Sequence, residues 1–146
     1  DEQELAGMFE VMGYLEGLGA GLSAIAMTRD ERDRLDRLHT EMAAFVREGD
    51  AARYAEANDV FHTAIYDGSH NGYLAEITRS TRQRLQPFRR AQFGELGRLL
   101  KSHAEHALIV EAILRGERDA AEQAMRSHIS LVGDAVQRMG WGAAGP

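Results

Sequence analysis

The sequence predicts an all-α fold: an antiparallel bundle of about six helices around a central cavity for a ligand or a metal ion. Apolar residues recur every three or four positions throughout the chain, which is the period of a helix with one buried face. The alternation typical of β-strands persists nowhere, and the only two prolines are Pro87 and Pro146. A chain of 146 residues with 44% hydrophobic side chains can form one domain with a real core.

The composition argues against several classes of function. The chain has 17 basic and 23 acidic residues and a net charge of −6, whereas a DNA-binding surface usually has a basic excess. The absence of cysteine excludes disulfides, thiolate catalysis and cysteine-ligated zinc. No apolar run approaches the roughly 20 residues of a membrane helix, and the acidic start is unlike a signal peptide. We therefore expect a cytoplasmic protein without a membrane partner, and the initial Asp1 suggests a piece of a longer chain.

The first predicted helix covers residues 2–27. Four glycines lower its intrinsic helix propensity and would let another backbone or a ligand come close; we favour tight helix packing as their role. They are Gly13, Gly17, Gly19 and Gly21. The apolar side chains follow nearly a heptad seam, formed by Leu5, Met8, Met12, Leu15, Leu18, Leu22 and Ile25.

Local signals set the limits of the next two helices. Thr28 and Glu31 form a capping box that starts a helix over residues 28–47. Gly49 ends that helix, and Asp50 can cap the next, which covers residues 51–66.

The third helix carries Asn58 and His62, which lie at i and i+4 and so share one face. Asn58 projects close to the centre of the buried arc and His62 projects nearer its edge. Asp59 projects more than about 90° away at 100° per residue. A carboxylate is the better ligand for a divalent ion, but this geometry favours Asn58.

Three more helices are predicted over residues 73–93, 95–115 and 118–139, followed by a flexible tail at residues 140–146. Pro87 can kink the first of them. In that helix Arg82 and Arg89 project beside the apolar stripe, whereas Arg79 and Arg90 point away. An inward arginine suits a carboxylate ligand, although a solvated basic face or salt bridges between subunits would also explain these residues.

His106 and His128 lie in line with the apolar stripes of the last two helices. Together with His62 and Asn58 they would offer three nitrogens and one oxygen, a set that suits Zn, Ni or Co and leaves coordination positions open. An open position allows either catalysis on bound water or capture of a carboxylate. A histidine on an apolar face can equally be a packed core residue, so a metal-free dimerisation module remains an alternative.

The enzyme alternative is a small metal-dependent hydrolase or lyase, which needs a general base near the ion. Asp59 and Glu105 are the only adjacent candidates, and both project away from the buried arcs. The sequence has no HExxH motif, phosphate-binding glycine loop or nucleophile elbow. We therefore expect the protein not to be an enzyme.

Short motifs in a fixed order carry a family resemblance. They are Leu15-Glu16-Gly17-Leu18, then Asn58-x-x-Phe61-His62, then Glu105-His106 with Ile109 and Ala112-Ile113, then Gly116, Ala120-Ala121 and Met125-x-x-His128. Over residues 4–136 the chain resembles the C-terminal ligand-sensing domain, named FCD, of GntR-family bacterial transcription regulators. We place this domain at residues 1–139.

The resemblance implies a helical bundle that holds a divalent metal, most simply zinc, through Asn58, His62, His106 and His128. It implies a small organic acid in the cavity and a homodimer. DNA would be bound only by a preceding winged helix-turn-helix domain, which is absent from this chain.

Two positions differ from the family pattern. The family usually has Asp where this chain has Asn58, which removes one negative charge from the metal site. Many members have Arg where this chain has Met12. An arginine contact with the effector would then be missing, or would come from Arg82 or Arg89.

Overall fold

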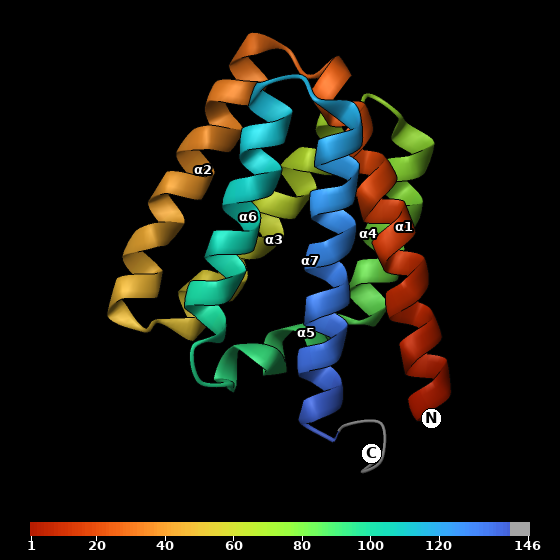
Figure 1. Ribbon diagram of the computed structural model, residues 1–146, viewed down its shortest axis with the longest axis vertical. Helices are drawn as coiled ribbons and strands as arrows, with labels where there is room; N and C mark the ends of the chain where they lie inside the picture. The colour runs from red at the N-terminus through yellow and green to blue at the C-terminus, as the bar shows by residue number, and fades with distance from the viewer. Residues whose placement is uncertain (141–146) are drawn as a thin grey trace.

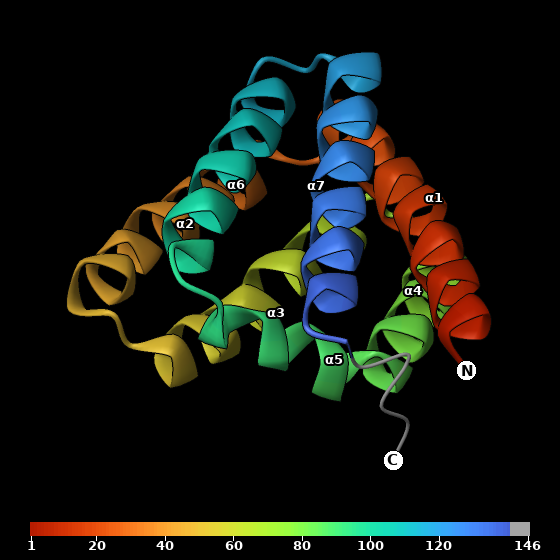
Figure 2. The same cartoon turned by 60° about the horizontal axis from the view of Figure 1, so that its bottom comes forward.

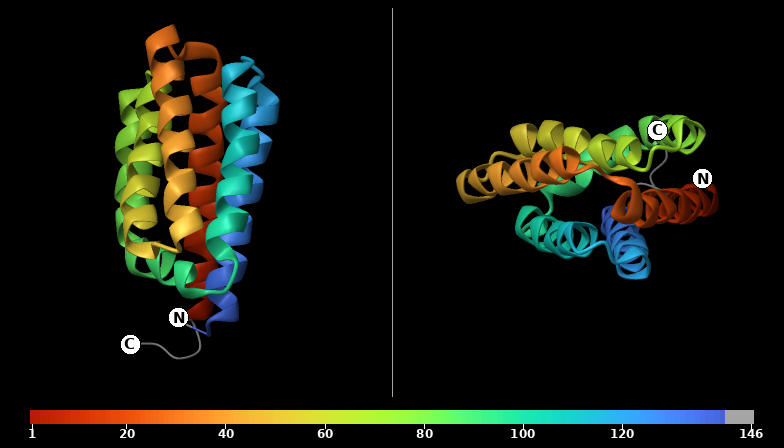
Figure 3. Two further views of the ribbon diagram at one scale, coloured as in Figure 1. Left: turned by 90° about the vertical axis from the view of Figure 1, so that its left-hand side faces the viewer. Right: turned by 90° about the horizontal axis from the view of Figure 1, so that it is seen from above.

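The computed structural model describes residues 1–140 and confirms the all-α prediction. Within this range there are seven α-helices, one 3-10 turn (η1) and no strand. The helices are α1 (Glu2–Ala26), α2 (Arg29–Glu48), α3 (Ala51–Gly68), α4 (Gly72–Arg84), α5 (Gln86–Ala91), α6 (Arg98–Leu114) and α7 (Arg118–Arg138), and η1 is Gln92–Gly94. The long helices run alternately up and down the bundle (Figure 1, Figure 3). None of the helices between residues 1 and 140 has the length and apolarity needed to cross a membrane.

The predicted single helix over residues 73–93 is wrong, because the chain breaks at Leu85. Leu85 has φ −95° and ψ 1°, outside the α-helical region, and Pro87 lies in the first turn of α5. A proline is tolerated there because the amides of a first turn have no intrahelical acceptor. As a result α5 runs across one end of the bundle and joins α4 to α6 (Figure 2). Gly97 has φ +77° and precedes the first residue of α6, so this helix begins at Arg98 rather than at residue 95 as predicted.

The predicted caps of α2 and α3 are confirmed. The Thr28 hydroxyl accepts a hydrogen bond from the Glu31 amide, and the Asp50 carboxylate accepts one from the Arg53 amide. Gly49 ends α2 in the left-handed conformation, with φ +65°. These local interactions are set by neighbouring residues, which is why the sequence alone places them.

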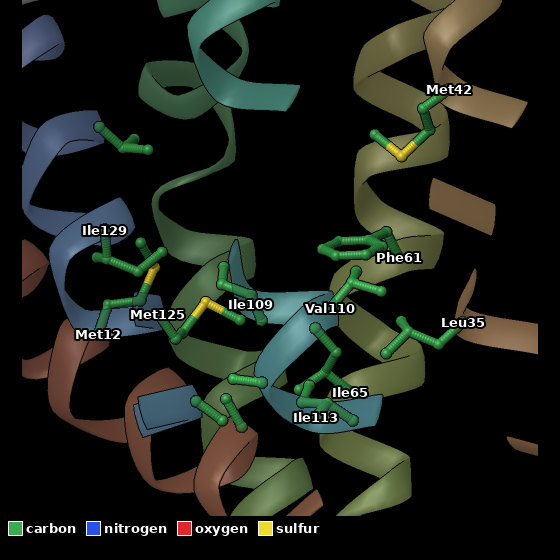
Figure 4. Close-up of a cluster of buried hydrophobic side chains, with 14 of the residues drawn as sticks. Met12, Leu35, Met42, Phe61, Ile65, Ile109, Val110, Ile113, Met125 and Ile129 are labelled. Carbon is green, nitrogen blue, oxygen red and sulfur yellow. The ribbon is translucent and has the colours of Figure 1, made fainter. Parts of the chain in front are cut away.

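One apolar core runs through the bundle (Figure 4). Each long helix contributes side chains with almost no solvent exposure, and burying such a side chain stabilises the fold by about 1.5–3 kcal/mol. The largest of them are Tyr54, Tyr66, Phe61, Met12, Leu35, Met42, Ile65, Leu85, Ile109, Ile113, Met125 and Ile129.

The glycines of α1 allow close packing against α7. A Cβ atom at Gly17 would lie 2.5 Å from Cγ of Arg126, and one at Gly21 would lie 3.3 Å from the Arg118 carbonyl oxygen. These contacts support the packing role favoured from the sequence. The two helices lie side by side over most of their length in Figures 1 and 2.

The predicted heptad seam of α1 is only partly correct. Leu5 and Met12 are buried, but Leu18 is 38% exposed and Ile25 is 57% exposed. After Met12 the buried face of α1 consists mainly of small residues, which permit the closest approach of the backbones. The same inner face carries Glu16, a fully buried carboxylate.

Candidate metal centre

The three predicted histidines converge inside the bundle. His62 comes from α3, His106 from α6 and His128 from α7, and their side chains are at most 3% exposed. One ring nitrogen of each lies within 4.8 Å of the other two. The closest pair is His106 Nε2 and His128 Nε2, at 3.1 Å. Residues far apart in the sequence thus present imidazole nitrogens to one point.

Glu16 of α1 forms a hydrogen bond with the His62 ring. His62 Nδ1 lies 2.6 Å from Glu16 Oε1, and because a carboxylate only accepts hydrogen bonds, Nδ1 is the donor. The Tyr66 hydroxyl donates to the same oxygen at 2.5 Å, and Arg82 donates to Glu16 Oε2 at 3.2 Å. Burial alone would raise the pKa of Glu16, but the charge of Arg82 and the hydrogen bonds from His62 and Tyr66 keep the pKa well below its usual range. Glu16 is therefore ionised.

Glu105 of α6 forms the same kind of hydrogen bond with the His128 ring. His128 Nδ1 donates to Glu105 Oε1 at 2.6 Å, and the Arg98 guanidinium binds both oxygens of Glu105 at 2.8 and 2.9 Å. Burial raises the pKa of Glu105, but the hydrogen bonds from Arg98 and His128 outweigh it and lower the pKa to about 2. The sequence predicts that Glu105 points away from the buried arc of its helix, but its side chain is only 16% exposed and contacts a candidate ligand directly.

His62 and His106 are in the neutral form that binds a metal. Burial and the nearby Arg82 charge lower the pKa of His62 to about 4, although Glu16 acts in the opposite direction. Burial and the neighbouring His128 and His62 hold the pKa of His106 well below its usual range. Both rings are neutral at neutral pH, and the neutral imidazole is a common metal ligand.

Several polar atoms at the centre have no hydrogen-bond partner among residues 1–140. They are Asn58 Oδ1 and His62 Nε2, both buried; His106 Nδ1 also has no partner, but His106 directs its other nitrogen, Nε2, toward His128. Such an atom normally costs about 1–3 kcal/mol unless a ligand, ion or water satisfies it. Because Nδ1 of His62 and of His128 is occupied by a carboxylate, the Nε2 lone pair of each ring is directed elsewhere. This donor set fits a divalent cation.

A cavity of about 10 Å³ adjoins the histidines, which is room for about one water molecule. Its wall includes Asn58, His62, His128, Arg82 and Arg89, and is completed by Gln92, Phe93, Ser102, Ile129 and Val132. The structure therefore brings the two arginines expected from the sequence to the same cavity as three of the four candidate metal ligands.

The arginines beside the cavity are already paired. Asp59 Oδ1 accepts from Arg82 at 3.1 Å and from Arg89 at 3.2 Å, and Asp59 Oδ2 accepts from the more exposed Arg90 at 3.1 Å. The arginines outweigh the effect of burial and lower the pKa of Asp59. Asp59, which projects away from the buried arc of α3, thus contacts three arginines.

Met12 lies in the apolar core, with no exposed surface, near Met125 and Ile129 in Figure 4. Sequence reasoning gave Glu16 no role beyond its place in a family motif. A signal existed, since Glu16 lies one helical turn after Met12 and one before Ala20 and so shares their buried face. Glu105 has no comparable local signal, because its burial depends on the position of α7.

The family model of the FCD domain matches residues 7–131. The chain belongs to the FCD domain family. The resemblance drawn from its sequence motifs is therefore confirmed.

Two solved structures share the fold of this FCD domain. E. coli McbR/YncC is 16% identical, with a TM-score of 0.85 over 95% of this chain and 66% of that chain. Streptococcus agalactiae GntR is 24% identical, with a TM-score of 0.76 over 92% of this chain and 60% of that chain. The chain thus spans about two thirds or less of the length of these proteins.

Proposed function

We propose that this FCD domain is the effector-binding and dimerisation domain of a cytoplasmic GntR-family transcription regulator. In this proposal Asn58, His62, His106 and His128 hold a divalent metal, with zinc the first choice and Ni or Co possible. A small organic acid binds beside it and alters DNA binding by an N-terminal winged helix-turn-helix domain. The observation that carries the proposal is the buried convergence of three imidazoles next to two cavity-lining arginines.

The small cavity suggests how ligand binding could alter the protein. A cavity of about 10 Å³ is too small for an organic acid, so binding must move part of the wall. Arg89, Gln92 and Phe93 belong to the short α5–η1 segment that follows the break at Leu85. An acid that binds the enlarged cavity stabilises the arrangement in which the wall has moved. It can shift the dimer between the arrangements with the small and the enlarged cavity only as far as its affinity for the two differs.

The enzyme alternative lacks a suitable base. Asp59 is bound by three arginines, and Glu105 is bound by Arg98 and His128 with its pKa lowered to about 2. A general base works best with a pKa near the working pH. Turnover of ester, amide or phosphate substrates by the metal-loaded domain would contradict the regulator proposal and favour a hydrolase.

Replacing Arg89 with Met should weaken binding of a carboxylate effector by about 10–100-fold, the equivalent of losing one charged hydrogen bond. Titration calorimetry of the metal-loaded domain with a panel of small mono- and dicarboxylates measures this loss. Arg90→Met is the matched control, because Arg90 also lies on α5 and binds Asp59 but is not part of the cavity wall. A panel without any binder, or equal losses in the two variants, would contradict the proposal.

The regulatory part of the proposal is tested on the full-length parent protein. We expect a carboxylate that binds the domain to change the affinity of the parent for its operator DNA. An operator affinity that no binding carboxylate changes would contradict the regulatory role, even if the metal is present.

A further inference from the structure

The four side chains proposed to contact the metal carry no charge. Asn58 is an amide, and His62, His106 and His128 bind a metal as neutral imidazoles. A divalent cation in such a buried place needs compensating negative charge nearby, since an uncompensated buried charge is strongly disfavoured. Besides a bound carboxylate effector, residues behind the ligands can supply this charge.

Two carboxylates lie behind the ligands: Glu16 is fully buried, and the side chain of Glu105 is 16% exposed. Glu16 contacts His62 Nδ1 at 2.6 Å, and Glu105 contacts His128 Nδ1 at 2.6 Å. The two acids come from different helices, α1 and α6, and each has its own arginine, Arg82 or Arg98. The same arrangement thus occurs twice at one centre.

Each carboxylate fixes the proton of its histidine. Because Glu16 and Glu105 only accept, the proton of each ring lies on Nδ1, and Nε2 keeps its lone pair. His62 Nε2 has no partner among the described residues, and His128 Nε2 points to His106. A carboxylate at Nδ1 also makes the opposite nitrogen a stronger ligand.

His106 differs from the other two histidines. No carboxylate contacts its Nδ1 within residues 1–140, and its ring stacks on Phe61 with centroids 4.4 Å apart. Packing against Phe61 positions His106, whereas charged hydrogen bonds position His62 and His128.

We infer that Glu16 and Glu105 are positioning residues for the metal: they fix His62 and His128 with Nε2 toward the ion, and they place carboxylates directly behind two ligands that carry no charge of their own. This inference rests on the proposed metal centre. It assigns a role in metal binding to Glu16 on α1, a helix that carries none of the four proposed ligands. It assigns the same role to Glu105, the neighbour of His106 on α6.

Glu105→Gln tests the inference with little change in shape. The Gln side-chain oxygen can still accept from His128, and Arg98 keeps its 2.7 Å bond to Gln92 Oε1. We expect the dissociation constant for Co²⁺, measured by competition with a chelator, to rise about 10–100-fold. We also expect the visible absorption of bound Co²⁺ to shift, a change that loss of stability alone does not cause.

Glu111→Gln is the matched control, since Glu111 lies on the same helix and pairs only with the exposed Arg115 in the described structure. It should leave both the Co²⁺ affinity and the spectrum unchanged. If Glu105→Gln binds Co²⁺ with the affinity and spectrum of the wild type, the inference fails while the metal centre stands. If the wild type binds no Co²⁺, both fail.

A measurement on the wild type needs no variant. Nitrogen-15 NMR of the histidine rings in the metal-free protein should show His62 and His128 protonated at Nδ1 and unprotonated at Nε2. The opposite tautomer in either ring would overturn the inference, whatever the stability of the variants.

Discussion

His106→Ala should remove the metal from the protein. We expect about one equivalent of Zn, Ni or Co in untagged wild-type protein and none in the variant, because a mononuclear site of this kind rarely tolerates the loss of one of its few protein ligands. Elemental analysis by mass spectrometry measures both. His106 is fully buried between His62 and His128, so no surface residue can take its place.

His70→Ala is the control for His106→Ala. His70 is half-exposed, contacts Glu31 rather than the three histidines, and should have no effect on metal content. A His106→Ala variant that keeps a full equivalent of metal would contradict the assigned ligand set. Wild-type protein without metal, even after addition of divalent ions, would favour the metal-free dimerisation module.

Glu16→Gln should lower the stability of the metal-free protein by on the order of 3 kcal/mol, since it leaves the buried Arg82 short of a negative partner. In a domain of 146 residues this corresponds to a fall in Tm of roughly 10 °C. The new amide would also direct N–H groups at Arg82, where Glu16 Oε2 now accepts at 3.2 Å. Urea unfolding followed by circular dichroism measures the change.

A second substitution identifies the cause of this loss. Arg82→Met combined with Glu16→Gln removes the stranded charge, so the double variant should recover part of the stability of the single variant. Glu10→Gln, an exposed change on the same helix, should stay within about 0.5 kcal/mol of the wild type. A Glu16→Gln protein as stable as Glu10→Gln would show that the Glu16–Arg82 pair contributes little.

The helices and their caps follow from interactions between residues close in the sequence. The period of the apolar residues predicts the all-α class. The capping residues Thr28, Gly49 and Asp50 predict where α2 begins, where it ends and where α3 begins. The inward direction of His62, His106 and His128 follows from the same period. The break at Leu85 does not, because Pro87 is compatible both with a kinked helix and with the start of a new one.

The sequence by itself therefore determined the fold class, the caps of α2 and α3, and the inward direction of the three histidines. Only the tertiary structure decided which carboxylates form hydrogen bonds with His62 and His128. Glu16 and His62 are 46 residues apart, and Glu105 and His128 are 23 apart, so their hydrogen bonds depend on how whole helices pack. The physical reason is that a helical period gives the direction of a side chain relative to its own axis. The period carries no information on the position of the neighbouring helix along its axis or on its rotation about that axis.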